Sequence, residues 1–155
     1  MTIYPQTQQE VFDTVATHLF KQGMQSRSND GCAYRAIANI NNQEVVLKCA
    51  VGALIPDLLY TESMEGHSVH GLLSDLSKST DVPTEAEQEL YQFLADHEDL
   101  LTVLQEAHDH KMEHSLGVND HSFLATMLAI AQRFGLNEIA LRAAHQAYIR
   151  QPQEA

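Results

Sequence analysis

The sequence predicts an α+β fold that is predominantly helical, with about five helices packed against one small antiparallel β-hairpin. Three observations predict it. Apolar residues recur every three or four positions over much of the chain. Two short apolar runs meet at Asn41 and Asn42. The length of 155 residues suits one core, so residues 1–155 are expected to form a single globular domain with a polar tail from about 151.

The first third of the chain carries the clearest local signals. A helix is expected over residues 8–22, because Thr7 and Glu10 form a capping box and Gly23 suits a helix C-cap. The polar run MQSRSNDG then reads as a loop. CAYRAIANI and EVVLKCAV read as two strands joined at Asn41 and Asn42, residues that tolerate positive φ in hairpin turns. This places Cys32 and Cys49 on opposite arms of one hairpin.

Helices dominate the rest of the expected fold. The apolar stretch after Cys49 is interrupted by Pro56, Gly66 and Gly71, which predicts only short helical turns. A helical pattern begins at Thr84 and is expected to break near Asp96 at a new cap. Two helices should follow, one from about 120 to 134 and one from about 137 to 150. Apolar residues surround most of the former, so it is expected to be the most buried helix.

Charge is the strongest functional signal. The chain has 21 acidic and 9 basic residues, and its net charge of −12 disfavours direct binding to nucleic acid or to an anionic membrane. Residues 81–113 contribute −9, from ten acids against the single base Lys111. The ten are Asp81, Glu85, Glu87, Glu89, Asp96, Glu98, Asp99, Glu106, Asp109 and Glu113. We expect them on the solvent side of one or two helices.

The sequence also bears on location. The first ten residues, MTIYPQTQQE, lack the basic start and apolar run of a secretory signal, and no segment approaches the length of a membrane span. A cytoplasmic location is therefore expected. The two cysteines are too few for a disulfide framework and are expected to be thiols there.

A histidine-rich segment near residues 108–121 suggests a metal site as one alternative. His110 and His114 would share a helix face, with Glu106 one turn before them and His121 arriving from the next helix. The HExxH motif is absent, since Leu101 stands where its second histidine would follow His97. The other reading is a solvated helix end, where histidines interact favourably with the helix dipole. We adopt that reading and predict no cofactor.

A second alternative is catalytic. His108 continues the apolar stripe of Leu101 and Leu104, which places its ring inward with Asp109 beside it. Cys49 lies where a predicted strand runs into a helical turn, a position that would suit a nucleophile with His108 as its base. That reading predicts a Cys/His-dependent hydrolase or a metal-binding enzyme centred on Cys49, His108 and Asp109, with Cys32, Arg35 and the downstream histidines as further candidates. The structural alternative is a satisfied core histidine and two small buried cysteines.

Five segments together resemble a family of small, uncharacterised proteins that recur in bacteriophages, prophages and their proteobacterial hosts. They are QEVFDTVATHLFKQG, GCAYR, LKCAVGALIPDLLY, MEG and LQEAHD, within about residues 9–135. The matched positions are Cys32, Tyr34, Arg35, Cys49, Gly52, Ile55, Tyr60, Glu65, Gly66, His108 and Asp109. The chain departs from the family in lacking tryptophan near its final helices and in a longer acidic, histidine-rich section. The resemblance implies no activity but does imply a mobile-element context, in which small acidic proteins often bind host proteins.

These observations favour a non-enzymatic acidic protein of phage or prophage type. Its negatively charged helical surface would bind a basic surface of a host protein, as an inhibitor or as a mimic of DNA charge. A charged face that only keeps the chain in solution is the simplest alternative. Self-association into a homodimer through the apolar final helices is a further one.

Overall fold

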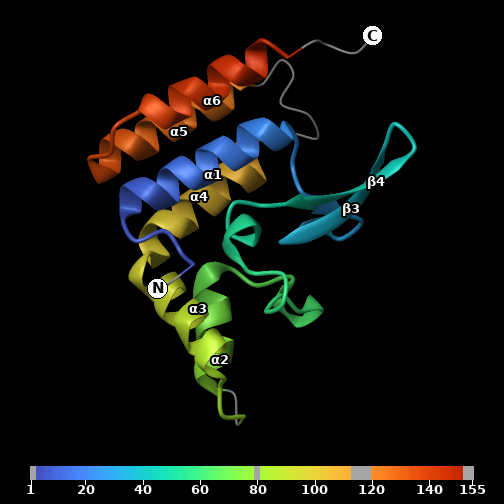
Figure 1. Ribbon diagram of the computed structural model, residues 1–155, viewed down its shortest axis with the longest axis vertical. Helices are drawn as coiled ribbons and strands as arrows, with labels where there is room; N and C mark the ends of the chain where they lie inside the picture. Colours follow the sequence, from blue (N-terminus) through green and yellow to red (C-terminus); the bar gives the residue numbers. More distant parts are fainter. Residues whose placement is uncertain (1–2, 79–80, 113–119, 152–155) are drawn as a thin grey trace.

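The computed structural model describes residues 3–78, 81–112 and 120–151, and within these ranges it confirms a mostly helical α+β fold (Figure 1). The six helices are α1 Gln8–Gln22, α2 Val69–Lys78, α3 Glu85–Asp96, α4 Glu98–Lys111, α5 Asp120–Phe134 and α6 Ile139–Ile149. The four strands are β1 Arg27–Ser28, β2 Gly31–Cys32, β3 Arg35–Ile40 and β4 Gln43–Lys48. They form two separate two-stranded antiparallel sheets.

Helix α1 is central to the packing. Its predicted bounds are confirmed: the Thr7 side chain accepts from the Glu10 N–H, and Gly23 ends the helix with φ 70°. Six apolar side chains of α1 are buried, and they pack the helix against α6 and α4. Since α4 also packs against α5, these four helices enclose the main core, as Figure 1 shows.

The predicted β3–β4 hairpin is also confirmed. Asn41 and Asn42 have φ of 53° and 65°, the two positive values that a type I′ turn requires. The hairpin projects beyond the helices in Figure 1. Its opposed residues Ile37 and Val46 are therefore 71% and 54% exposed, although Ala36 nearer the helices is buried.

The expected polar loop after α1 differs from the structure, because it folds into the small β1–β2 hairpin. Cys32 pairs with Arg27 in that hairpin, whereas Cys49 follows β4. The two cysteines therefore do not lie on opposite arms of one hairpin as predicted. Strands of two residues are too short to show the alternation by which strands are recognised in sequence.

Helix α2 replaces the short turns expected around Gly71. The Ser68 hydroxyl accepts from the Gly71 N–H, so the chain has a capping side chain at this end of the helix. Glycine in a helix costs roughly 0.5–1 kcal/mol relative to alanine. Burial of Val69 and Leu72 offsets that cost, since each apolar side chain contributes about 1.5–3 kcal/mol when removed from water.

The acidic helices follow the predicted pattern more closely. Thr84 and Glu87 form a reciprocal capping box at the start of α3. The helix breaks at His97, one residue after the expected position, and α4 begins at Glu98. Leu90, Phe93 and Leu94 of α3 face the core, which leaves the carboxylates of that helix toward solvent or its edge.

Helix α5 is less buried than the sequence predicts. Phe123 and Met127 are fully buried, but Ala125 and Ala129 are exposed. Alanine counts as an apolar residue when a helix is predicted from its sequence pattern. Its side chain is so small, however, that leaving it exposed to water costs little free energy. Among the helices of the described part of the chain, none combines the length and apolarity needed to cross a lipid bilayer.

Candidate functional site

A buried polar junction forms where α4 ends. Gln25, only 2% exposed, donates through Nε2 to the carbonyl oxygens of His108, Asp109 and Met112, at 3.0, 2.9 and 3.1 Å. The last carbonyls of a helix have no partner within the helix, so an outside donor is needed when they are buried. Gln25 supplies it from the segment that follows α1.

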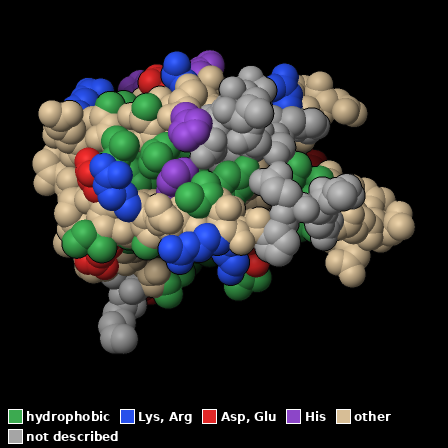
Figure 2. Space-filling model, turned by 90° about the horizontal axis from the view of Figure 1, so that it is seen from above, with side chains coloured by type: hydrophobic (Ala, Val, Ile, Leu, Met, Phe, Trp, Pro, Cys, Tyr) green, Lys and Arg blue, Asp and Glu red, His purple; other side chains and the backbone are tan. Residues whose placement is uncertain are grey.

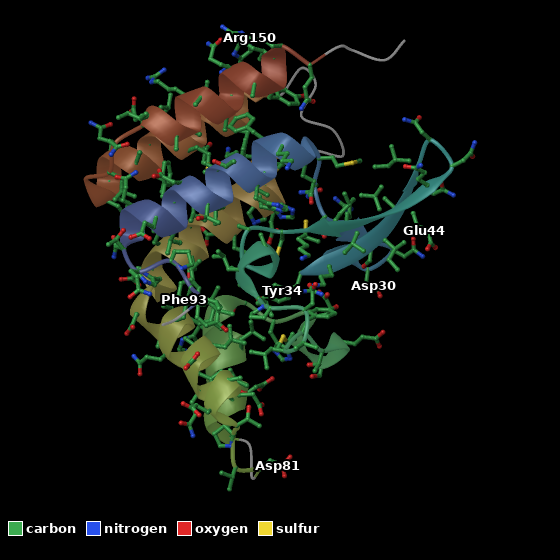
Figure 3. The ribbon with its side chains drawn as sticks, viewed as in Figure 1. Asp30, Tyr34, Glu44, Asp81, Phe93 and Arg150 are labelled. Carbon is green, nitrogen blue, oxygen red and sulfur yellow. The ribbon has the colours of Figure 1, made fainter. Side chains whose placement is uncertain are left out.

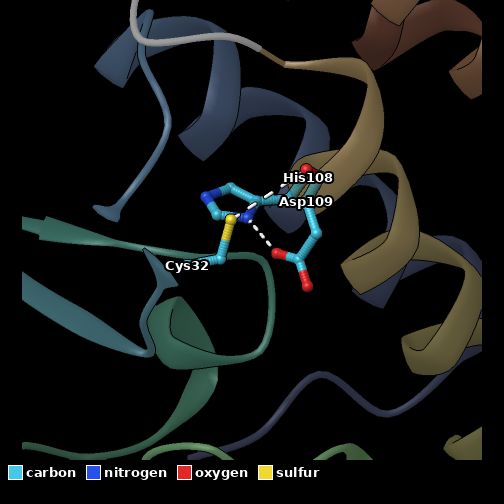
Figure 4. A group of neighbouring side chains, drawn as sticks. All are labelled: Cys32, His108 and Asp109. Atoms are coloured by element: carbon cyan, nitrogen blue, oxygen red, sulfur yellow. Dashed lines mark hydrogen bonds and ion pairs between the residues drawn. The ribbon is translucent and has the colours of Figure 1, made fainter. Parts of the chain in front are cut away.

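The geometry around His108 fixes its tautomer. Its Nε2 accepts from the Ser26 backbone N–H at 2.9 Å, so the ring proton lies on Nδ1. Nδ1 then donates to Asp109 Oδ1 at 2.7 Å, and that carboxylate oxygen also accepts from Gln105 Nε2. Figure 4 shows the contact between the two adjacent side chains. His108 is fully buried, and both of its ring nitrogens are engaged.

This arrangement bears on the catalytic alternative of Cys49, His108 and Asp109. A histidine that acts as a general base needs a free lone pair toward its nucleophile, and here Ser26 occupies that lone pair. Cys49 lies elsewhere in the network: its Sγ accepts from the Gly52 N–H at 3.2 Å. Burial raises the pKa of Cys49 to about 12, which keeps it a thiol.

Cys32, rather than Cys49, lies beside the His108–Asp109 pair. The potential ligand atoms of Cys32, His108 and Asp109 lie within 4.8 Å of one another (Figure 4). The Cys32 thiol donates to the Asp109 carbonyl oxygen at 3.9 Å. Burial, and then the Asp109 carboxylate, raise the pKa of Cys32 to about 11. Sequence reasoning centred this site on Cys49 and gave Cys32 only as a further candidate, because the β1–β2 hairpin that brings Cys32 to the end of α4 was expected to be a loop.

The trio has the donor types of a metal site, but its hydrogen bonds oppose that use. A metal on His108 Nδ1 would displace the ring proton to Nε2, where it would meet the Ser26 N–H, and two donors would then face each other. The trio is better explained as part of the buried junction. It is also the one such three-residue group found among the residues that the structure describes.

The histidine-rich alternative for metal binding draws on different residues. His110 and His121 are both exposed, and neither belongs to the trio. Glu106 is exposed on α4, one turn before His110. His114 and Glu113 lie outside the described residues.

Three segments of the chain, GCAYR, LKCAVGALIPDLLY and MEG, meet at Glu65. Its carboxylate accepts from the backbone N–H groups of Tyr34 and Arg35, at 2.8 and 3.1 Å, and from the Tyr60 hydroxyl. The Arg35 guanidinium lies 4.6 Å from the centre of the Tyr60 ring. Burial and the Glu65 carboxylate raise the pKa of Tyr60 to about 12. One carboxylate thus fixes three segments of the chain.

Gly52 completes this contact. A Cβ atom at Gly52 would lie 2.1 Å from the carbonyl oxygen of Tyr34, which is too close for any other residue. The same oxygen accepts from the Cys49 N–H at 3.3 Å. GCAYR and LKCAVGALIPDLLY are therefore joined by backbone contacts, and MEG is joined to both by the Glu65 carboxylate. LQEAHD joins them where Gln105 Oε1 accepts from the Val51 N–H.

A hollow of about 300 Å³ lies beside these segments. Its lining includes Cys32, Tyr34, Glu65, Gln105 and Asp109. The carboxylates of Glu65 and Asp109 already accept hydrogen bonds from the chain itself. A ligand there would have to compete with the contacts that hold the fold together.

The predicted acidic surface divides into two groups. Asp81, Glu85, Glu89, Asp96, Asp99 and Glu106 are exposed. Three others are partly buried and have structural partners: Glu87 in the capping box, Glu98 at 3.0 Å from His70, and Asp109 in the junction. The exposed group follows α3 and α4 and the residues just before α3.

Three basic side chains lie on the last two helices: Arg133 on α5, Arg142 on α6 and Arg150 at the C-cap of α6. Arg133 lines one hollow with Glu106 of α4, and Arg142 is paired with Glu138 at 2.9 Å. Figure 2 shows basic, histidine and acidic side chains together on the face seen from above. Arg150 and Asp81 lie at opposite ends of the long axis in Figure 3. The acid just before α3 is thus far from Arg150, whereas Glu106 of α4 lies near Arg133 of α5.

Comparison with known proteins assigns nothing further. No protein-family model, curated protein or solved structure matches the chain. Its function is therefore inferred from the geometry and charge of its own residues.

Proposed function

We propose that the protein is a non-enzymatic acidic binding protein of phage or prophage type. It docks on a basic surface of a host protein through α3 and α4, as an inhibitor or a mimic of DNA charge. The observation that carries the proposal is the exposed acidic group, Asp81, Glu85, Glu89, Asp96, Asp99 and Glu106. These residues belong to the segment that contributes −9 of the net −12.

The concentration of exposed acids along α3 supports a binding role. A concentrated negative field draws a basic partner toward one face and accelerates association, while scattered charges of both signs would not. Arg150 lies at the opposite end of the long axis from Asp81, so it does not neutralise the acids near the start of α3. Such binding weakens as salt is added, because the Debye length falls from about 10 Å at 0.1 M to about 3 Å at 1 M.

The buried chemistry supports a non-enzymatic role. The lone pair of His108 is held by Ser26, and burial raises the pKa of Cys49 to about 12. The cysteines and His108 therefore act as packing and hydrogen-bonding groups. Cytoplasmic location and a host partner belong to the same proposal, since a basic target of a phage-type protein would be found there.

The test is capture from a proteobacterial lysate at low and moderate salt, with two charge-matched variants. E85Q/E89Q/D99N removes three exposed acids from α3 and α4. D30N/E44Q/E62Q removes three exposed acids elsewhere, with the same side-chain changes. Each protein captured by the wild type is then purified and its binding measured by calorimetry.

We expect a purified basic host protein to bind the wild type and the second variant alike, but the first variant at least about tenfold more weakly. The loss should shrink at higher salt. Equal binding by both variants would overturn the proposal, and so would binding that does not depend on salt.

A further inference from the structure

The β1–β2 hairpin lies between two hollows. Its base is closed by Ser26 and Ala33, where the Ala33 N–H donates to the Ser26 carbonyl oxygen at 3.0 Å. Residues 27–29 line a hollow of about 900 Å³, and Cys32 lines the hollow of about 300 Å³. Asp109, near the end of α4, lines both. The hairpin therefore has room to move relative to α4.

Ser26 joins the base of this hairpin to α4. Its N–H donates to His108 Nε2 at 2.9 Å, and its hydroxyl donates to the Leu47 carbonyl oxygen of β4 at 3.2 Å. Cys32 adds only a long contact to α4, 3.9 Å from its Sγ to the Asp109 carbonyl oxygen. Within the described part of the chain, the bond from Ser26 to His108 is therefore the main polar contact between the hairpin and α4.

This bond requires an unprotonated Nε2. Neutral His108 carries its ring proton on Nδ1, which donates to Asp109 Oδ1 at 2.7 Å. A second ring proton converts Nε2 from an acceptor to a donor, so that two N–H groups face each other. The Asp109 carboxylate stabilises the imidazolium that forms. Proton uptake therefore breaks the bond to Ser26 and keeps the bond to Asp109.

The ionisable groups nearest to His108 do not take up this proton in its place. Burial lowers the pKa of His18 on α1, and charge on His108 contributes to that lowering. Burial, and then the Asp109 carboxylate, raise the pKa of Cys32 on β2 to about 11, so Cys32 stays a neutral thiol. Asp109 is thus the one charged partner of His108 among these groups.

Charged side chains on the other neighbouring elements lie at the surface. On α4 itself, His110 and Lys111 are exposed. Lys48 of β4 is half-buried, and its Nζ is paired with Asp57 at 3.3 Å. The others are exposed, namely Lys21 of α1, Arg27 of β1, and His121 and Arg133 of α5.

We propose that His108 is a pH-sensitive latch, whose protonation releases the β1–β2 hairpin from the end of α4. Below about pH 6.5, where a histidine in water gains its proton, the open form holds one proton more than the closed form. Each further pH unit then favours opening by up to about tenfold. Gln25 and Tyr34 flank the moving segment and stay bonded to the α4 carbonyls and to Glu65. Opening exposes the Cys32 thiol and the end of α4.

The test is amide hydrogen exchange, followed by NMR on the nitrogen-15-labelled full chain at about pH 7.5 and about pH 5.5. Each rate is divided by that of the unfolded chain at the same pH, which removes the direct effect of pH on exchange. The amides of Ser26 and Ala33 report on the latch, and the amide of Leu19, buried in α1, reports on unfolding of the core. The ring nitrogens of His108 report where its proton lies.

We expect the His108 proton on Nδ1 at about pH 7.5, and protection of Ser26 and Ala33 about tenfold lower at about pH 5.5, with a smaller change at Leu19. H18Q, which removes the other buried histidine of this region, should keep that fall. H108Q keeps an acceptor for Ser26 but cannot titrate, so its protection should not depend on pH beyond the change at Leu19. D109N removes the carboxylate that stabilises the imidazolium and should reduce the fall.

Three results would overturn the latch: a proton on Nε2 at about pH 7.5, unchanged protection of Ser26 in the wild type, or an equal fall in H108Q. If H108Q does not fold, D109N decides. A fall in D109N as large as in H18Q would then contradict the role of the His108–Asp109 pair.

Discussion

His108 Nε2 accepts the backbone N–H of Ser26, and this contact ties the end of α4 to the segment after α1. The two residues are 82 positions apart in the chain. Gln25 strengthens the same connection by donating to three carbonyls at the end of α4. The bond explains why an ionisable residue lies fully buried in the core. Substitution of His108 therefore tests whether the residue serves the fold rather than catalysis.

Replacement of His108 with alanine should destabilise the protein by about 3 kcal/mol. The loss combines an unsatisfied Ser26 N–H, worth about 1–3 kcal/mol, with a cavity in the core. Glutamine can place a carbonyl oxygen near the position of Nε2, so H108Q should cost less, about 1 kcal/mol. Urea unfolding of both variants measures this difference. Equal destabilisation would show that the acceptor toward Ser26 contributes little.

The second prediction concerns the effect of replacing Glu65 on stability and on the pKa of Tyr60. E65Q replaces an acceptor-only carboxylate, which three donors approach, with an amide that carries donors of its own. We expect a loss of about 1–3 kcal/mol in the free energy of unfolding. The pKa of Tyr60, about 12 in the wild type, should also fall, because the negative charge that helps to raise it is gone. Carbon-13 NMR of labelled tyrosine, assigned with Y60F, measures that pKa. An unchanged pKa would show that burial alone raises the pKa of Tyr60.

Cysteine reactivity separates the structural reading from the catalytic one. Both thiols have a raised pKa, about 11 for Cys32 and about 12 for Cys49, so little thiolate is present near neutral pH. Cys49 is fully buried and Cys32 is partly exposed. We expect slow alkylation of the native protein, with Cys32 reacting first and Cys49 only on unfolding. Mass spectrometry of single-cysteine variants measures each rate. Rapid alkylation of Cys49 in the folded protein would revive the nucleophile alternative.

The sequence predicted elements whose signals are local. Thr7, Gly23 and the capping box at Thr84 mark helix ends through contacts three or four residues long. The turn at Asn41 and Asn42 is also a local signal, because it depends on two adjacent residues. Helix α2 was missed because Gly71 was read as a break, although the Ser68 hydroxyl bonds its N–H.

The candidate site depends on contacts that no local pattern contains. Sequence reasoning identified His108 as inward-facing and placed Asp109 beside it. It paired His108 with Cys49 and kept Cys32 only as a further candidate, because it could not foresee that β1–β2 would carry Cys32 to the end of α4.

The lowered pKa of His18 leads to a prediction of how the stability of the folded protein depends on pH. Burial lowers the pKa of His18 in the folded protein, and its Nε2 lies 2.9 Å from the Lys48 carbonyl oxygen. The unfolded chain, with a histidine pKa of about 6.5, therefore takes up this proton first as pH falls. This difference in pKa stabilises the folded protein fully above about pH 6.5. The stabilisation is lost as the pH falls from about 6.5 toward the lower pKa that His18 has in the folded protein. H18Q keeps an amide donor for Lys48 but cannot titrate. Urea unfolding at about pH 7.5 and about pH 5.5 should show the wild type losing more stability than H18Q, and an equal loss would contradict the role of His18.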